Sequence, residues 1–424
     1  MDCHFSPVTD FERLERSMTD LYGAGKLPAQ AERYRRLLRE MEAAFGAAER
    51  LAVFSAPGRT EIGGNHTDHQ HGRVLAGSVD LDMIAAVAPS GDRCIRIQSE
   101  GFPMDVVDLD DLNVHEEERN TSAAIIRGIS AWFTRHGCKL EGFNAYTTSN
   151  VLKGSGLSSS AAFEVLVGNI INSLFYENRC SPVQIAQIGQ YAENVYFGKP
   201  SGLLDQMASS VGGMVTIDFK DNENPVVERV NFDFAATGHA LCIIDSGADH
   251  ADLTEEYAAV TAELRGICAY FGRNVLREVP EEEFHAALPA LRSRAGDRAV
   301  LRAMHIYDDN RRVERQVAAL KAGDFQAFLD QVRASGLSSW RYLQNVVPAG
   351  CTHHQNVALA LALCEQLLGG VGACRVHGGG FAGTVQAFVP LEMLEGFWRE
   401  IERVLGDGAC HVLTIRPVGG VRLA

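Results

Sequence analysis

A glycine- and serine-rich loop followed by an apolar helix is the segment of this sequence that most directly indicates chemistry. Residues 149–168 read SNVLKGSGLSSSAAFEVLVG. Gly154 and Gly156 let a backbone approach an anion closely, and the free N–H groups at the start of the next helix attract phosphate oxygens. The three serines at 158–160 add hydroxyls for phosphate or Mg²⁺. Such a loop alone is also compatible with a plain turn that ends in a serine N-cap.

The loop differs from the two best-known nucleotide-binding loops. The pattern G-x-x-x-x-G-K-[ST] is absent from the sequence. The dinucleotide pattern G-x-G-x-x-G is not met either, because Ser159 stands at its last glycine position. The residues therefore predict an anion site without deciding which anion it binds.

Two carboxylates lie in a further segment, residues 192–213 (AENVYFGKPSGLLDQMASSVGG), where Glu193 and Asp205 are 12 positions apart. The apolar stripe of the expected helix consists of Ile185, Ile188, Ala192 and Val195. Helical periodicity places Glu193 opposite this stripe, which by itself predicts a solvated charge. Asp205 has few charged neighbours, so it is a candidate for catalysis or for a helix cap.

Strands and helices of mixed order must position these side chains. A strand at 143–148 is expected to lead into the loop, and a helix at 161–175 to follow it. Other strands are predicted at 51–55, 74–88, 94–98, 106–109, 241–244, 385–389 and 412–415, and other helices at 10–49, 120–135, 252–271, 310–335 and 355–368. The strand at 51–55 is expected to end at Ala56-Pro57-Gly58. Without strict strand–helix alternation, the pattern favours an α+β fold.

Composition limits the class of protein. Hydrophobic residues make up 46% of the 424 residues and charged residues 22%, as in globular proteins. The net charge of −15 argues against a nucleic-acid partner, and no apolar run is long enough to cross a membrane. Ten cysteines without a Cys-x-x-Cys pair, and no secretory signal, predict a cytoplasmic protein without disulfides. We expect it to be a monomer or small homo-oligomer. The polar segment 219–228 suggests two domains, 1–230 and 231–424.

Three ordered segments resemble motifs of the GHMP kinases. The loop is similar to their second motif, P-x-G-x-G-L-[GS]-S-S-A, with Leu152 in place of proline. Residues 56–72 (APGRTEIGGNHTDHQHG) resemble the galactokinase signature G-R-x-N-L-I-G-E-H-T-D-Y, and residues 375–389 (RVHGGGFAGTVQAFV) resemble the third motif. Residues 192–213 also resemble a galactokinase block, A-E-H-x-x-x-G-x-P-[CS]-G-x-M-D-Q. The resemblance implies a two-domain GHMP kinase fold with its active site in the cleft between the domains.

The resemblance also implies a role for single residues. Asp205 would be the catalytic carboxylate facing the sugar C1 hydroxyl, with Arg59 beside the transferred phosphoryl group. The ATP phosphates would lie on Lys153, Gly154, Ser155, Gly156, Leu157, Ser158, Ser159 and Ser160, and Mg²⁺ on Ser160 and Glu193. The sugar would contact Asn65, His66, Asp68, Gly202 and Tyr257. The glycines of the third motif would pack against the phosphate loop and shape the pocket.

The sugar end departs from the family pattern. Asn65 replaces a glutamate that contacts the C6 hydroxyl in the family, His69 replaces a tyrosine, and Glu61-Ile62-Gly63 replaces Asn-Leu-Ile. A neutral Asn65 would tolerate a C6 carboxylate. The predicted reaction is therefore transfer of the ATP γ-phosphate to C1 of galactose, with galacturonate, N-acetylgalactosamine or arabinose as alternatives. A metal site formed by His66, Asp68, His69 and His71 is a minor alternative, and a non-catalytic sugar sensor is a third.

Overall fold

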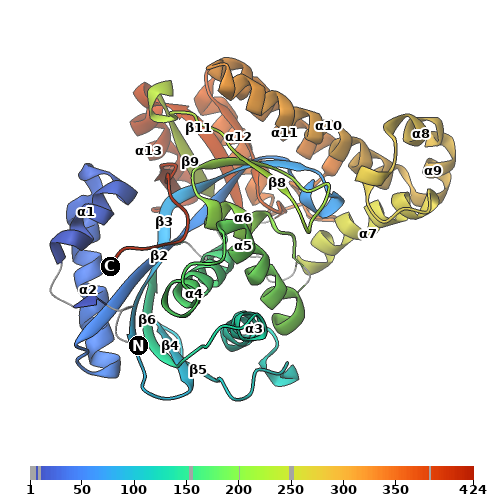
Figure 1. Ribbon diagram of the computed structural model, residues 1–424. Helices are drawn as coiled ribbons and strands as arrows, with labels where there is room; N and C mark the ends of the chain where they lie inside the picture. Colours follow the sequence, from blue (N-terminus) through green and yellow to red (C-terminus); the bar gives the residue numbers. More distant parts are fainter. Residues whose placement is uncertain (1–5, 8–10, 152–155, 200, 248–252, 382) are drawn as a thin grey trace.

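The computed structural model of the protein describes residues 6–7, 11–151, 156–199, 201–247, 253–381 and 383–424. The strands of this part of the chain form a nine-stranded and a four-stranded sheet (Figure 1). The larger sheet contains β1 (Ser6–Pro7), β2 (Arg50–Gly63), β3 (Arg73–Pro89), β4 (Cys94–Ser99), β5 (Asp105–Asp108), β6 (Phe143–Ser149), β7 (Met214–Asp218), β8 (Val226–Arg229) and β13 (Val421–Arg422). Its main order is β1-β2-β3-β6-β4-β5, and β4 and β6 form its parallel pair.

The smaller sheet has the order β10-β11-β9-β12 and is antiparallel. Its strands are β9 (His239–Asp245), β10 (Ala373–His377), β11 (Thr384–Pro390) and β12 (Cys410–Leu413). The chain passes from the larger to the smaller sheet between β8, which ends at Arg229, and β9, which begins at His239. The boundary proposed at residue 230 falls within this connection. The C-terminus then returns to the larger sheet, where Val421 pairs with Ser55 of β2, so the two halves interlock. The mixture of sheets and helices confirms the predicted α+β class.

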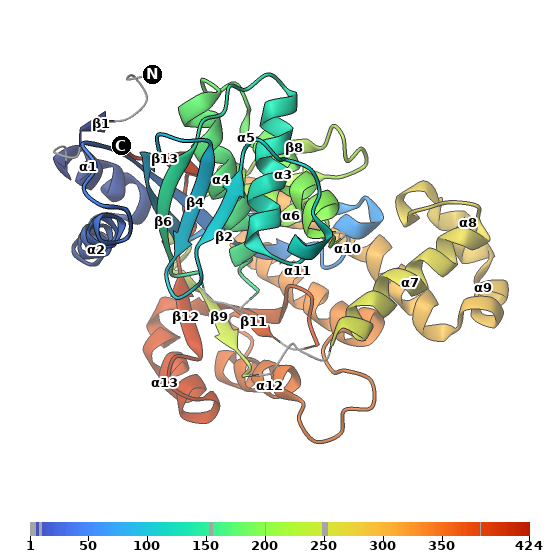
Figure 2. The ribbon, with the colours of Figure 1, turned by 90° about the horizontal axis from the view of Figure 1, so that it is seen from below.

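Helices cover both faces of the larger sheet (Figures 1 and 2). Successive residues of β2 point to opposite faces, so Leu51 and Val53 pack beneath α1 (Phe11–Tyr22) and α2 (Leu27–Phe45). Ala52 and Phe54 face the other side, which carries α3 (Ser122–Arg135) and α4 (Ser159–Phe175). Behind these lie α5 (Pro182–Tyr191) and the π-helix η4 (Ala192–Phe197), while α6 (Leu204–Val211) packs directly on β2 and β3. The phosphate loop thus enters a helix that is anchored in the core.

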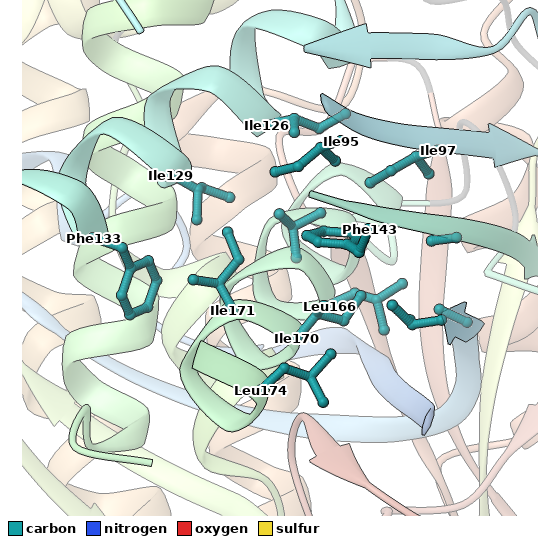
Figure 3. Packing of buried hydrophobic residues seen from close by; sticks show 14 of the residues in the cluster. Ile95, Ile97, Ile126, Ile129, Phe133, Phe143, Leu166, Ile170, Ile171 and Leu174 are labelled. Carbon is teal, nitrogen blue, oxygen red and sulfur yellow. The ribbon is translucent and has the colours of Figure 1, made fainter. Parts of the chain in front are cut away.

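Figure 3 shows how this anchoring is achieved. Branched and aromatic side chains of α3 and α4 pack on two strands of the sheet. The labelled members are Ile95 and Ile97 of β4, Phe143 of β6, Ile126, Ile129 and Phe133 of α3, and Leu166, Ile170, Ile171 and Leu174 of α4. Burying a side chain of this size stabilises a fold by roughly 1.5–3 kcal/mol. The body of α4 is therefore held firmly against the sheet.

The second half supplies further helices, of which α7 lines the cavity described below. They are α7 (Thr254–Tyr270), α8 (Glu281–Ala286), α9 (Leu288–Ala295), α10 (Asp297–Lys321), α11 (Phe325–Ser338), the π-helix η7 (Ser339–Leu343), α12 (Asn356–Leu368) and α13 (Leu394–Leu405). Figures 1 and 2 show α7, α8 and α9 projecting from the body of the molecule. The start of α7 lies near the third motif, because Tyr257 donates a hydrogen bond to the carbonyl of Gly380.

Three predicted element boundaries are wrong. The strand at 51–55 does not end at Ala56-Pro57-Gly58, because β2 continues to Gly63 through register shifts that accommodate the proline. The helix expected at 10–49 is two helices, with Gly23 at a φ of 78° between them. The helix expected at 310–335 breaks after Lys321, and Asp324 caps the start of α11. The extended β2 brings Arg59 and Glu61 onto a sheet strand rather than a loop.

Candidate active site

A cavity of about 870 Å³ collects most of the predicted functional residues. Its walls come from β2, the start of α4, residues 190–199 and 201–206, the first turns of α7 and the third motif. The predicted residues that line it are Arg59, His66, Asp68, Ser160, Glu193, Gly202, Asp205 and Tyr257. Since Tyr257 and the third motif belong to the second half of the chain, the cavity lies between the two halves.

Arg59 and Asp205 form an ion pair in the wall of the cavity. Arg59 Nε donates to Asp205 Oδ1 at 2.7 Å, and Arg59 Nη1 donates to the carbonyl oxygen of Gly156. The Asp205 side chain is 36% exposed, whereas that of Arg59 is 9% exposed, so the carboxylate faces the cavity. Burial alone would raise the pKa of Asp205, but Arg59 and a hydrogen bond from Ser158 hold it below its usual value. Asp205 is therefore ionised at neutral pH.

The described part of the phosphate loop opens α4 as predicted. Gly156 has a φ of 70° and Ser158 one of 57°, and α4 begins at Ser159. The Ser158 side chain does not cap α4, so it accepts no hydrogen bond from the first N–H groups of this helix. A 17-residue helix that starts in this way provides N–H donors for an anion. Lys153, Gly154 and Ser155 lie outside the described residues.

β2 lies directly against this loop. Arg59 N donates to the carbonyl oxygen of Leu157 at 2.9 Å. A Cβ added to Gly58 would lie 2.9 Å from that same oxygen, so only glycine allows the approach. The first and second motifs are therefore in backbone contact, which fixes the Arg59 side chain relative to the phosphate loop.

Glu193 is buried, contrary to the expectation from helical periodicity. It is 4% exposed, while Val195, which was expected in the apolar stripe, is 42% exposed. The reason is η4, a π-helix, whose extra residue per turn shifts the register after Tyr191. Glu193 therefore points into the cavity rather than into solvent.

Glu164 and Gln206 are two neighbours of Glu193 that sequence reasoning missed. Gln206 Nε2 donates to Glu193 Oε2 and to Glu164 Oε2, each at 2.9 Å. Burial, and next the charge of Glu193, raise the pKa of Glu164 well above its usual value. The sequence feature that could have identified Glu164 is its position as the single charged residue in the apolar run 161–168.

The donors near Ser160 and Glu193 suit Mg²⁺, which takes oxygen ligands and keeps several waters beside a triphosphate. Ser160 is exposed and lines the cavity together with Glu193. The buried oxygens Glu164 Oε1 and Gln206 Oε1, next to Glu193, have no hydrogen-bond partner within the described residues. In that same part of the chain no group of three or more His, Cys, Asp or Glu side chains is arranged to hold a metal, and this includes the His66–His71 segment.

The predicted sugar end of the cavity is formed by the first motif, the carboxylate block and the third motif. His66 has a φ of 61°. Its Nε2 is hydrogen-bonded to the carbonyl oxygen of Gly379 at 3.0 Å. Burial lowers the pKa of His66 to about 4, so its ring is neutral at pH 7. A Cβ added to Gly202 would lie 2.2 Å from Asp68 Oδ2, which shows how tightly the carboxylate block packs on the first motif.

The third motif packs closely against both ends of the cavity, as predicted. A Cβ added to Gly378 would lie 4.0 Å from Gly156 Cα, and one added to Gly379 would lie 2.5 Å from the ring of Tyr257. His377, just before these glycines, accepts a hydrogen bond at Nε2 from Glu61 N, at 3.2 Å. A side chain at position 379 would push the third motif and the ring of Tyr257 apart.

Asn65 is the predicted sugar-binding residue that the structure places differently. It is 0% exposed and does not line the cavity, whereas Glu61, four residues earlier, does. Burial raises the pKa of Glu61, while Arg375 and Arg59 oppose that shift. His69 lines the cavity and is exposed.

Known proteins share this fold and these motifs. The chain matches "GHMP kinases N terminal domain" over residues 123–213 and "Galactokinase galactose-binding signature" over residues 40–89. The structure of Lactococcus lactis galactokinase complexed with galactose has a TM-score of 0.77 at 24% identity, covering 92% of this chain and 99% of that one. A Methanococcus jannaschii mevalonate kinase has a TM-score of 0.62 at 13% identity, covering 86% and 98%. The fold is thus that of the GHMP kinases.

The curated relatives narrow the class. Galactokinase of Streptomyces coelicolor is 31% identical over 380 residues, which cover 88% of this chain and 95% of that protein. Galactokinase of Glaesserella parasuis is 30% identical over 366 residues, covering 84% and 89%. The chain belongs to the galactokinase family of the GHMP kinases, and it is a phosphotransferase enzyme. Among the described residues, no helix combines the length and the apolar character that a membrane span requires.

Proposed function

We propose that this enzyme transfers the γ-phosphoryl group of ATP to the C1 hydroxyl of galactose, giving galactose 1-phosphate and ADP. The observation that carries the proposal is the Arg59–Asp205 pair, 2.7 Å apart, with Arg59 also bound to the carbonyl of Gly156 in the phosphate loop. The guanidinium of Arg59 thus links Asp205, which would contact the sugar, to the loop that would hold ATP. The family relatives named galactokinase support galactose as the acceptor.

The side chains divide the work of phosphoryl transfer between them. Asp205, held ionised by Arg59, accepts the hydrogen bond of the C1 hydroxyl and orients its oxygen toward the γ-phosphorus. The C1 oxygen forms the new P–O bond as the bond to the ADP oxygen breaks, and the hydroxyl proton leaves toward Asp205. A carboxylate with a lowered pKa is a weak base, so its main contribution is orientation and electrostatics. Arg59 offsets negative charge on the transferred group.

The triphosphate lies on the loop and on the start of α4. Gly156, Leu157, Ser158, Ser159 and Ser160 are the described members of this cradle, and Lys153, Gly154 and Ser155 complete it in the proposal. Ser160 and Glu193 would hold Mg²⁺, which supplies positive charge to the phosphate oxygens. Glu193 is kept in place by the hydrogen bond from Gln206.

The sugar lies between the first and third motifs, in contact with His66, Asp68, Gly202 and Tyr257. They offer a neutral imidazole (His66), a carboxylate (Asp68), a backbone peptide group (Gly202) and a phenol (Tyr257). Together these groups match a ligand that both donates and accepts hydrogen bonds. We further propose a cytoplasmic monomer or small homo-oligomer. The location is supported by the free thiols of the nine cysteines within the described residues.

The test is a sugar panel on the purified protein. ADP release is measured with ATP, Mg²⁺ and, in turn, galactose, galacturonate, N-acetylgalactosamine, arabinose and glucose, and ³¹P NMR locates the phosphate in the product. We expect the highest kcat/KM for galactose, with the phosphate at C1. A higher kcat/KM for another sugar would replace galactose by that sugar, and ADP release with none of them would favour the sensor reading.

A further inference from the structure

Glu61 is a cavity-lining carboxylate that the reaction as described does not use. In the galactokinase signature an asparagine and a glutamate occur in that order, four residues apart. Here the same two residue types occur in the opposite order, as Glu61 and Asn65. Their side chains are in direct contact, because Asn65 Nδ2 donates to Glu61 Oε1 at 3.0 Å. The two changes therefore affect one contact and have to be considered together.

Asn65 has no hydrogen-bonding capacity left for a ligand. Its Nδ2 donates to Glu61 Oε1 at 3.0 Å and to the Gly378 carbonyl at 2.7 Å. Its Oδ1 accepts from Ser339 Oγ at 3.2 Å and from Asn345 Nδ2 at 2.9 Å. These four bonds use both N–H groups and both lone pairs of the amide. With 0% exposure, the side chain is a buried connector rather than a sugar contact.

Glu61 is in the opposite situation. Arg375 Nη2 donates to its Oε1 at 2.6 Å, and Asn65 donates to the same oxygen. Arg375 is itself fully buried and is fixed by bonds to the carbonyls of Ile62 and Val376. The second carboxylate oxygen, Oε2, receives no hydrogen bond from the described residues. A nearly buried carboxylate with one oxygen saturated and one unused is costly unless a ligand supplies the missing donor.

The position of Glu61 in the strand directs it toward the acceptor. Arg59 and Glu61 are two residues apart in an in-register part of β2, so both side chains project from the same face of the sheet. Two residues of a strand span about 7 Å. Glu61 therefore lines the same cavity as Arg59 and Asp205, next to Gly378 and Gly379 of the third motif.

We propose that Glu61 Oε2 accepts a hydrogen bond from a hydroxyl of the bound sugar, while Asn65 and Arg375 hold the carboxylate in place. Glu61 is then a specificity-determining residue, and Asn65 a positioning residue. The acceptor is a neutral polyhydroxylated sugar, because an acidic substituent beside Glu61 would bring two negative charges together. This inference rests on the proposed sugar-kinase function, and it deepens it by disfavouring galacturonate.

The test compares Glu61→Gln with a matched control. The variant keeps the shape of the side chain but replaces one carboxylate oxygen by an N–H donor. The control is Glu118→Gln, which alters a Glu–Arg pair (Arg127, at 2.6 Å) that does not line the cavity. KM and kcat for galactose, galacturonate and ATP are measured for the wild type and both variants, with melting temperatures as a check on folding.

For Glu61→Gln we expect KM for galactose to rise roughly 10-fold or more, the usual effect of losing a hydrogen bond to a charged group. The galacturonate-to-galactose ratio of kcat/KM should rise as well, with KM for ATP unchanged. Glu118→Gln should change none of these values. Galactose kinetics and a sugar ratio that stay as in the wild type in Glu61→Gln would overturn the proposal.

The wild type separates this inference from the proposed function. If it phosphorylates no sugar, the function fails and the inference falls with it. If it phosphorylates galactose, only the Glu61 comparison decides the inference. Should Glu61→Gln not fold, the wild-type ratio alone still decides: galacturonate used as well as galactose would contradict the role of Glu61, and a strong preference for galactose would support it.

Discussion

The two ends of the cavity reach their geometry by different means. At the phosphate end, motif residues touch one another directly: Arg59 binds both Asp205 and the carbonyl of Gly156. At the sugar end, residues outside the motifs complete the contacts, as Ser339 and Asn345 do for Asn65. His66 bonds to the carbonyl of Gly379, and Asn65 is surrounded by the third motif and η7.

The difference bears on Glu61 and Asn65, which depart from the family pattern together. A change in a directly paired charge leaves the partner unpaired in a buried place, which is strongly unfavourable. A change within a larger network can be offset by a second change, as with Glu61 and Asn65. The substitutions below test whether the two ends respond in these different ways.

The largest effect is expected at the phosphate end. Asp205→Asn should lower kcat roughly 10²- to 10⁴-fold, because the C1 hydroxyl loses its charged acceptor and Arg59 its partner. ATP binding, measured with a fluorescent analogue, should remain. Asp110→Asn, in an exposed pair with Arg93, is the control and should leave kcat unchanged. A kcat near the wild-type value in Asp205→Asn would remove Asp205 from the reaction.

At the sugar end, a single change should cost more than the paired one. Asn65→Glu removes both N–H donors and places a second carboxylate beside Glu61 and the Gly378 carbonyl. We expect kcat/KM for galactose to fall roughly 10- to 100-fold, or the melting temperature to drop, since bonds to charged groups contribute about 1.5–3 kcal/mol. The double variant Glu61→Asn with Asn65→Glu, which has the order of the family signature, should recover most of this loss. Equal losses in the single and double variants would contradict a coupled pair.

A smaller effect is expected where the carboxylate block meets the first motif. Gly202→Ala places a Cβ where it would lie 2.2 Å from Asp68 Oδ2, so that carboxylate must move. KM for the sugar should rise about 5- to 10-fold, corresponding to one displaced hydrogen bond, with KM for ATP unchanged. Gly266→Ala in α7, where a Cβ meets nothing within 4 Å, is the control. The prediction fails if both variants bind sugar as the wild type does.

The smallest effect concerns pH. Burial lowers the pKa values of His66 (to about 4), His305 and His377, so the folded protein binds fewer protons than the unfolded chain below pH 6.5. Their contribution to stability is therefore complete above about pH 6.5 and is lost as the pH falls toward 4. The raised pKa values of Glu61 and Glu164 act in the opposite direction.

The contribution of one histidine is isolated by comparing the wild type with His66→Gln. The difference in melting temperature between pH 7 and pH 5 should be smaller in His66→Gln, by a few degrees at most. Asp205, with its lowered pKa, should remain ionised over this range, so kcat should not decline through loss of its charge. An identical pH dependence of the two melting temperatures would show that His66 is not buried in its neutral form.

Much of the phosphate end was predictable from the sequence because its residues lie in short motifs. The strand, loop and helix around Gly156 follow from local patterns, whereas the roles predicted for Asp205 and Glu193 come from the resemblance of their segment to a galactokinase block. The orientation of Glu193 was not predictable. Regular helical periodicity predicts that Glu193 is exposed. In the structure the π-helix η4 turns Glu193 inward and leaves Val195 42% exposed.

The sugar end shows the limit of sequence reasoning. The sequence by itself determined that Asn65 and Glu61 depart from the family pattern, but each departure was a separate observation. Only the tertiary structure showed that they touch, that Arg375 holds Glu61 from 314 residues away, and that Ser339 and Asn345 saturate Asn65. Contacts over such separations leave no periodicity or spacing in the chain. They are decided by how the two halves pack, because a buried polar group must find its partner wherever the fold places one.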